Sequence, residues 1–204
     1  MKKYFFYNAF ALLTVFLFSN TMVAQSTDER YQALNDYLET IIKDTTQVIY
    51  IAKEKINSNE TLKVFKLNDI MVIDSDGNGK GDTTLYKEKD FKLMEKKYQN
   101  NCIPGRLQWC RDDYWEIENF KYRKISLQSV NSPKAIELIF DKNDDKDIIV
   151  HGFSEPIYYQ NKKYIIFTKD RSGLTSYHAN IIVMEKRKGK WIVTHKGENP
   201  NIMN

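Results

Sequence analysis

Two segments of the chain carry hydrophobic side chains at helical spacing. Residues 27–44 and 88–99 place apolar positions three or four residues apart, which predicts two amphipathic helices. The apolar positions are Tyr31, Leu34, Leu38, Ile41 and Ile42 in the first, and Phe91, Met94 and Tyr98 in the second. Thr27 stands where the first helix would begin, and Asp90 is the expected N-terminal cap of the second.

Short runs rich in β-branched and aromatic residues predict strands elsewhere. Before the second helix these runs are the first half of 46–56, then 62–73 and 83–86. Beyond residue 134 the runs are 135–140, 148–153, 156–169, 176–186 and 190–195, separated by turn residues. This succession predicts an antiparallel meander of three or four strands. The segment 102–130 fits either a helix or a strand.

These elements predict an α+β fold, in which helices pack on a curved antiparallel sheet that ends in a C-terminal β-meander. Residues 25–204 are long enough for a single domain with a substantial core. The first 24 residues have a different composition. Lys2 and Lys3 precede the apolar run 10–18, and the small residue Ala24 follows, which is the layout of a secretory signal peptide.

The apolar run is short for a membrane span of about 20 residues. We therefore expect residues 1–24 to be removed and the protein to be exported, to the periplasm or beyond, without a transmembrane anchor. Loss of Lys2 and Lys3 would leave 29 basic and 27 acidic side chains, a net charge of +2. Such a balance offers no broad electrostatic surface for nucleic acid, so we expect no nucleic-acid partner.

The cysteine content agrees with export. Cys102 and Cys110 are the two cysteines of the chain, and Pro104 and Gly105 lie between them. An even cysteine count in an exported protein predicts a disulfide. A redox-active pair is the alternative, but the C-x-x-C spacing that lowers a thiol pKa is absent from the sequence.

The stretch "VIDSDGNGKGDTTL", residues 72–85, has the composition of a cation-binding loop. Its oxygen ligands for calcium would be Asp74, Asp76, Asn78, the carbonyl of Lys80, and Asp82. The spacing resembles the calcium hairpins with the pattern D-x-D-x-[DN]-G-x-x-D. It departs from the EF-hand, because Leu85 stands where that loop needs a glutamate. A plain solvated hairpin turn, rich in Asp, Asn and Gly, is the alternative.

Histidine and serine residues raise the alternative of a small exported hydrolase. His151, His178 and His195 lie on three different predicted strands, and a grouping of Ser154, His178 and Asp170 is conceivable. The sequence contains neither the H-x-x-x-H spacing of zinc enzymes nor a G-x-S-x-G turn. We therefore interpret the histidines as structural.

Aromatic residues concentrate in two places. Trp109, Tyr114, Trp115, Phe120 and Tyr122 surround the cysteine segment, and Tyr158 and Tyr159 form a second concentration. Such rings are usually core, but exposed ones could stack on a glycan or contact a partner protein. The sequence thus favours a non-catalytic binding or accessory protein with an unknown protein or glycan partner.

The segments "GFSEPIYYQNKKYIIF" and "IIVMEKRKGKWIV" resemble a set of uncharacterised exported proteins of Gram-negative bacteria. In those proteins an F-S-x-P-[IV]-[FY] motif begins a strand and a G-K-W hairpin ends the chain. The ending is also similar to the last two strands of NTF2-like domains. The resemblance implies that Ser154 and Pro156 begin a strand and that Trp191 packs beneath the sheet. It implies no catalytic residue.

Overall fold

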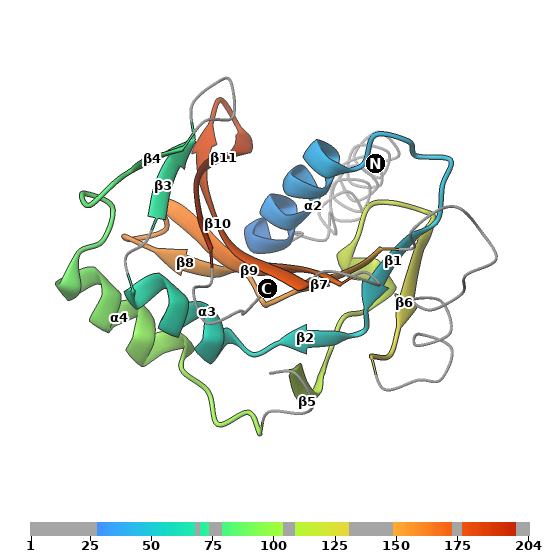
Figure 1. The fold of residues 1–204 in the computed structure, drawn as a ribbon, viewed down its shortest axis with the longest axis horizontal. Helices are drawn as coiled ribbons and strands as arrows, with labels where there is room; N and C mark the ends of the chain where they lie inside the picture. The colour runs from blue at the N-terminus through green and yellow to red at the C-terminus, as the bar shows by residue number, and fades with distance from the viewer. Residues whose placement is uncertain are drawn as a thin grey trace, which may run out of the picture.

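The computed structural model describes residues 28–67, 70–73, 79–103, 109–130, 149–172 and 177–198 (Figure 1). The predicted signal peptide and the predicted strand 135–140 lie outside these ranges. The described helices are α2 Glu29–Ile41, α3 Ser58–Lys66, α4 Glu88–Tyr98 and the short 3-10 helix η2 Ile117–Asn119. None of the described helices is long and apolar enough to cross a membrane.

The two predicted helices are present as α2 and α4, with different N-terminal residues. Asp28, not Thr27, caps α2, because its carboxylate accepts a hydrogen bond from the backbone N–H of Arg30 at 3.0 Å. Helix α4 begins at Glu88, after Lys87, which makes no side-chain cap. Asp90 therefore lies in the first turn of α4 rather than at its cap.

Helix α3 replaces the first half of the strand predicted at 62–73. The side chain of Asn57 caps it by accepting from the N–H of Asn59 at 2.9 Å, and Glu60 follows three residues after the cap. Leu62 and Phe65 are buried on one face of this helix. The β-branched and aromatic residues of 62–73, such as Val64 and Phe65, suggested a strand, but the capping signal and tertiary packing favour a helix.

Eleven strands are described: β1 Ile49–Ala52, β2 Glu54–Ile56, β3 Ile70–Ile73, β4 Gly79–Gly81, β5 Trp109–Tyr114, β6 Ile125–Gln128, β7 Val150–Phe153, β8 Ile157–Tyr159, β9 Tyr164–Ser172, β10 Tyr177–Arg187 and β11 Lys190–Glu198. The strand predicted at 83–86 is wrong, because those residues form bends after β4. The ambiguous segment contains β5, η2 and β6.

Nine strands form one sheet with the order β4-β3-β11-β10-β9-β7-β1-β6, and β8 pairs with β9 beside this path. The pairs β9–β10 and β10–β11 are antiparallel, so the C-terminal meander is confirmed. The sheet as a whole is mixed, because β1 is parallel to both β6 and β7. Strands β2 and β5 form a separate pair.

Helices cover both faces of the meander. Figure 1 shows α2 on one side of β9–β11 and α3 with α4 on the other. The core under α2 contains Leu34, Leu38, Phe153, Phe167, Ile182, Met184 and Trp191. The core under α3 and α4 contains Phe65, Phe91, Met94, Tyr159, Ile166, Ile181 and Val183. Trp191 is buried against residues of β10, as its alternation predicts. These observations establish an α+β fold.

Candidate functional site

The calcium-loop prediction falls largely outside the described part of the chain. Asp74, Asp76 and Asn78 belong to the range 74–78, which the structure does not describe. Lys80 lies in β4, exposed and opposite Val72 of β3. Among the described residues no group of three or more His, Cys, Asp and Glu side chains could hold a metal ion. Calcium binding by this segment stays a prediction.

Asp82 already has protein partners. Its carboxylate accepts from the N–H of Thr84 at 2.7 Å and lies 3.1 Å from Nε2 of His195. Nδ1 of His195 lies 2.9 Å from the hydroxyl of Thr194. Hydrogen bonds from Thr84, and then from His195, hold the pKa of the Asp82 carboxyl below its usual value. Thr194 and His195 are both buried, so this arrangement links β11 to the segment after β4.

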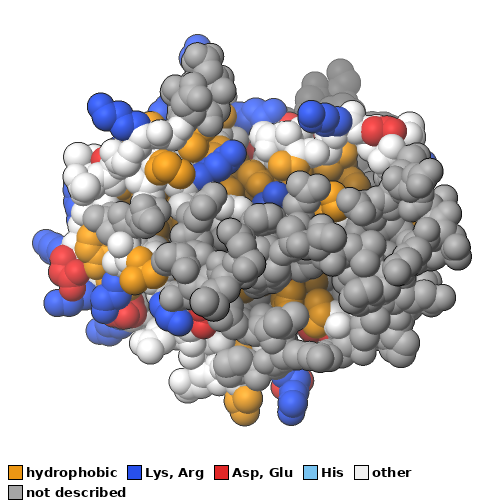
Figure 2. All heavy atoms as spheres, in the orientation of Figure 1, with side chains coloured by type: hydrophobic (Ala, Val, Ile, Leu, Met, Phe, Trp, Pro, Cys, Tyr) orange, Lys and Arg blue, Asp and Glu red, His pale blue; other side chains and the backbone are white. Residues whose placement is uncertain are grey.

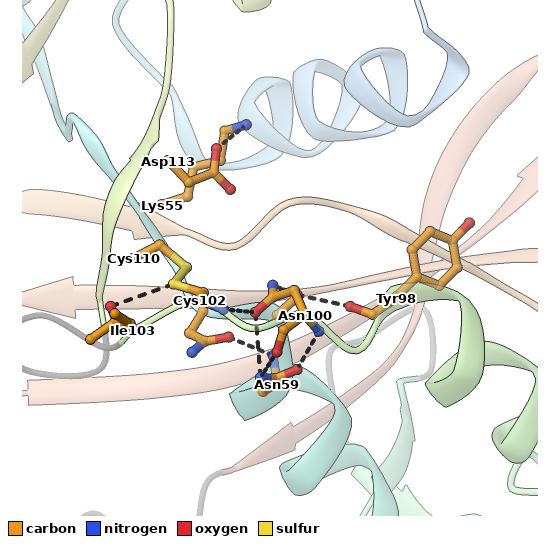
Figure 3. The surroundings of a disulfide bond; sticks show 10 residues. Lys55, Asn59, Tyr98, Asn100, Cys102, Ile103, Cys110 and Asp113 are labelled. Atoms are coloured by element: carbon orange, nitrogen blue, oxygen red, sulfur yellow. Dashed lines mark hydrogen bonds and ion pairs between the residues drawn. A yellow bond between two sulfur atoms is a disulfide. The ribbon is translucent and has the colours of Figure 1, made fainter.

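The predicted disulfide is confirmed between Cys102 and Cys110, whose Cα atoms are 5.8 Å apart. Figure 3 shows how the preceding chain is held to α3. The Asn59 amide donates to the carbonyl of Asn100 at 2.9 Å and accepts from its N–H at 3.1 Å. Asn100 in turn accepts from the N–H of Cys102 at 2.9 Å. The disulfide therefore ties β5 to the segment that follows α4, and the Asn59–Asn100 hydrogen bonds hold this same segment to α3.

Ser154 does not present its hydroxyl to solvent. The side chain is fully buried, and its Oγ accepts from the hydroxyl of Thr61 at 3.0 Å and from the N–H of Thr168 at 2.8 Å. The Ser154 N–H donates to the carbonyl of Thr168 at 3.0 Å. Because β7 ends at Phe153 and β8 starts at Ile157, the serine oxygen substitutes for a backbone acceptor at this break.

The histidines are dispersed over three strands, as the sequence suggests. His151 lies in β7, His178 in β10 and His195 in β11. His151 and His178 both stand opposite Arg171 in the register of β9, whereas the buried Asp170 stands opposite Ala179. The side chain of His178 lies outside the described part. The buried hydroxyl of Ser154 thus gives the grouping no accessible nucleophile.

The aromatic concentration around the disulfide is mostly core. Trp109, Trp115 and Phe120 are buried, and the Trp115 indole donates to the carbonyl of Phe153 at 3.3 Å. These two tryptophans are therefore core residues, as such rings usually are, and do not form the alternative, an exposed platform. Tyr114 is exposed, with the Lys53 ammonium 5.2 Å from its ring centroid. The apolar surface of the large rings is used to join β5 to the sheet.

The second aromatic concentration lines an open groove of about 380 Å³ between α4 and the turn that connects β8 to β9. We call it the tyrosine groove. Its walls are Asp90, Leu93, Met94, Lys97, Tyr98, Tyr158, Tyr159, Gln160, Asn161 and Lys162. The α4 residues among them recur at intervals of three and four, so one stripe of the helix faces the groove. Figure 2 shows basic and acidic side chains with hydrophobic surface between them at the left edge, over α4.

The β8–β9 turn, which forms one wall of the tyrosine groove, has an uncommon backbone. Gln160, Asn161 and Lys162 have φ of 48°, 52° and 67°, three successive left-handed residues without a glycine. The N–H of Lys163 donates to the carbonyl of Gln160 at 3.1 Å, and the Gln160 amide donates to the carbonyl of Leu85 at 2.9 Å. These bonds, with those of the buried Tyr159 hydroxyl to the same segment, hold the turn.

Ion pairs hold β8 in place on the other side. Glu155 lies 3.2 Å from Nη1 of Arg30 in α2 and 2.8 Å from Nζ of Lys55 in β2. Lys55 also pairs with Asp113 at 3.0 Å (Figure 3). The Pro156 carbonyl accepts from Arg30 at 3.4 Å. The segment that leads to Tyr158 is thus fixed to two elements that are distant in the sequence, α2 and β2, and Lys55 of β2 is in turn paired with β5.

Two lysine ammonium groups of the tyrosine groove lie close to the ring of Tyr158. The Lys162 ammonium lies 5.3 Å and the Lys97 ammonium 5.9 Å from its ring centroid. Lys97 also lies 4.8 Å from the ring of Tyr98. Burial and the neighbouring carboxylates of the α2 N-terminus raise the pKa of the Tyr158 phenol, so the ring is neutral at physiological pH.

A larger groove of about 470 Å³ lies between the end of α2, β1 and His151. Its walls include the aliphatic side chains Ile41, Ile42, Val48, Ile49 and Ile149. Lys43, Asp44, Gln47, Tyr50 and His151 also line this larger groove. The tyrosine groove differs by its three tyrosines and by the two lysine ammonium groups within 6 Å of one ring centroid, that of Tyr158. It is therefore the better candidate for a specific ligand site.

Comparisons with known proteins bring no relative. No family model, no curated protein and no solved structure matches this chain.

Proposed function

We propose that this protein is an exported, non-catalytic binding module that holds a glycan in the tyrosine groove. The observation that carries the proposal is the half-buried ring of Tyr158, set among amide and ammonium groups on a rigidly held turn. The disulfide is compatible with export, and the resemblance of residues 152–167 to exported proteins supports it.

The size of the groove favours a small ligand. About 380 Å³ lies within the roughly 300–1,000 Å³ of small-molecule sites. A stable protein partner would need about 1,000 Å² of complementary surface. The exposed large hydrophobic residues come from different elements and include Val48, Leu67, Val72, Leu93 and Ile103. Scattered residues of this kind are ordinary surface, so they supply no second argument for a protein partner.

The chemistry of the groove suits a sugar. The apolar faces of pyranose rings stack on aromatic rings, and the half-buried Tyr98 and Tyr158 offer such surface at low entropy cost. Asn161 and Asp90 provide hydrogen-bond donors and acceptors for hydroxyl groups. Leu93, 62% exposed, extends the apolar surface on the α4 side. Rings and polar groups together account for both stacking and orientation of a sugar.

The test is titration of the full chain with a panel of neutral and acidic di- and trisaccharides, followed calorimetrically. We expect Tyr158→Ala to weaken binding at least tenfold, because truncating a central aromatic contact typically costs about 2 kcal/mol. Asn161→Gly, a change that the left-handed φ accepts without strain, should weaken binding about threefold. The latter variant keeps the test decisive if Tyr158→Ala unfolds.

Tyr114→Ala is the matched control. Tyr114 is an exposed tyrosine with a lysine ammonium over its ring, but it lies in β5, outside the groove. Its variant should bind as the wild type does. Absence of binding to every saccharide of the panel, or equal losses in the Tyr158 and Tyr114 variants, would contradict the proposed function.

A further inference from the structure

We infer that the glycan held in the tyrosine groove is acidic, and that Lys97 and Lys162 bind the carboxylate of its uronic-acid residue. This inference rests on the proposed function and specifies the class of ligand. Three observations carry it: the side chains retained on the left-handed turn, the absence of carboxylate partners for the two lysines among the described residues, and the charge of the groove.

The turn keeps side chains where glycine would be less strained. The other tight hairpin of the meander, between β10 and β11, places Lys188 at φ 49° and Gly189 at φ 82°, so one of its two left-handed residues is a glycine. The β8–β9 turn instead places Gln160, Asn161 and Lys162 in the left-handed region, at roughly 1–2 kcal/mol for an ordinary residue and less for Asn. Backbone strain of this kind recurs at ligand-binding segments. It directs an amide and an ammonium group into the groove wall.

Most lysines beside the two hairpin turns pair with a carboxylate, including Lys163 with Glu185 at 3.6 Å, whereas Lys188 forms no ion pair with a described residue. At the β10–β11 hairpin Lys186 pairs with Glu29 at 2.6 Å, and Lys190 pairs with Glu39 at 2.6 Å. Lys97 and Lys162 form no ion pair with a described residue, although both lie within 6 Å of the Tyr158 ring centroid. Their ammonium groups are thus near the ring on which the sugar stacks and have no carboxylate within ion-pair distance in the described structure.

The acidic residues next to Tyr158 form their ion pairs with other cations, although Lys162 also interacts electrostatically with Asp28 and Glu29. Asp28 pairs with Arg30 at 2.5 Å, and Glu29 pairs with Lys186. The charged side chains that line the groove are Lys97, Lys162 and Asp90, a net charge of +1. One carboxylate balances this charge, whereas a phosphate monoester with nearly two charges would exceed it and be repelled more strongly by Asp90. The groove therefore suits a monoanionic sugar.

The experiment compares trimers that contain one galacturonic, glucuronic or mannuronic acid residue and two neutral sugars with the corresponding neutral trimers, by calorimetric titration of the full chain. We expect at least one acidic trimer to bind at least tenfold more tightly than its neutral counterpart. The double variant Lys97→Gln, Lys162→Gln should lose this preference and still bind the neutral sugar. The affinity for the acidic trimer should also fall with added salt.

The double variant Lys89→Gln, Lys96→Gln is the matched control. Both residues are exposed on α4 but do not line the groove, and the change in net charge is the same. This variant should retain the preference for the acidic sugar. An equal loss in both double variants would show a general charge effect and overturn the assignment to Lys97 and Lys162.

The outcomes separate the inference from the proposed function. Equal affinity for acidic and neutral trimers, with binding lost in Tyr158→Ala, would overturn the acidic ligand and leave the glycan site standing. Binding of neither class would overturn both. Tighter binding of a sugar phosphate than of every uronic-acid trimer would overturn the carboxylate assignment.

Discussion

Ser154 and Tyr158 lie four residues apart, yet their polar surroundings differ completely. Around Ser154 each hydroxyl and N–H that we describe has a partner inside the protein, and water is excluded. Around Tyr158 the side chains meet in an open groove, and Lys97 and Lys162 have no ion-pair partner among the described residues. The comparison teaches that a serine near a histidine in sequence can be structural, while a neighbouring turn lines the groove in which we propose ligand binding.

The two regions differ in what satisfies the hydrogen-bonding groups: other protein groups around Ser154, and water in the tyrosine groove. Burial of an unpaired polar group is unfavourable by about 1–3 kcal/mol, so the Ser154 cluster contributes to stability only while it is complete. Groups in an open groove are satisfied by water, and a ligand can replace that water with little penalty. Substitutions in the two regions should therefore separate stability from binding.

We expect the largest loss of stability from a substitution in the hydrophobic core. Trp191→Ala should lower the free energy of unfolding by about 3–5 kcal/mol, because the ring is buried beneath α2 with Ile182 and Met184. Urea denaturation measures this loss. Ile192→Ala, at an exposed position of the same strand, is the control and should change it by less than about 1 kcal/mol. A loss below about 1 kcal/mol for Trp191 would contradict the packing of the meander.

The closed polar site should show an intermediate effect. Ser154→Ala leaves the buried N–H of Thr168 without its acceptor, so we expect a loss of about 1–3 kcal/mol in urea denaturation. Saccharide binding per folded molecule should be unchanged. Thr46→Val, which removes an exposed hydroxyl bonded to Asp44, is the control with an effect below about 0.5 kcal/mol. A catalytic or binding role for Ser154 would instead appear as a functional loss without a stability loss.

In the tyrosine groove we expect a substitution that raises the free energy of unfolding instead of lowering it. Lys162→Gly relieves a left-handed residue, and this relief of roughly 1–2 kcal/mol exceeds the added chain entropy of glycine, about 0.5–1 kcal/mol. We expect thermal and urea denaturation to show a gain of up to about 1 kcal/mol, together with weaker binding of acidic trimers. Lys163→Gly is the control, because its φ is not positive and no strain is relieved. Destabilisation by both changes would argue against strain in this turn.

The smallest expected effect is on the pH dependence of stability, and it tests the hydrogen bonds of Asp82 with Thr84 and His195. Hydrogen bonds from Thr84, and then from His195, depress the pKa of Asp82 in the folded protein. Its contribution to stability is therefore present above the unfolded Asp value of about 3.9 and is lost as pH falls through the lower folded value. Asp82→Asn should flatten the stability curve in this acid range. Curves of identical slope for both proteins would contradict the pairing of Asp82 with Thr84 and His195.

Local patterns in the sequence determined a large part of the fold. The helical stripes of α2 and α4, the strands of the meander, the buried position of Trp191 and the pairing of Cys102 with Cys110 all follow from residues close together in the chain. Periodicity reports which face of an element is buried, and short spacing limits which cysteines can meet. The sequence also contains the capping pair Asn57 and Glu60, and this pair would have identified α3 as a helix.

Long-range packing decided the rest. Alternation does not specify a neighbour, so the parallel insertion of β1 between β6 and β7 could not be inferred from it. The burial of Ser154 depends on Thr61 in α3, and the tyrosine groove joins Lys97 in α4 to Lys162, 65 positions later in the numbering. The sequence by itself determined which segments are amphipathic and which cysteines pair. Only the tertiary structure decided which polar side chains are enclosed and which line an open groove, because that depends on contacts between distant elements.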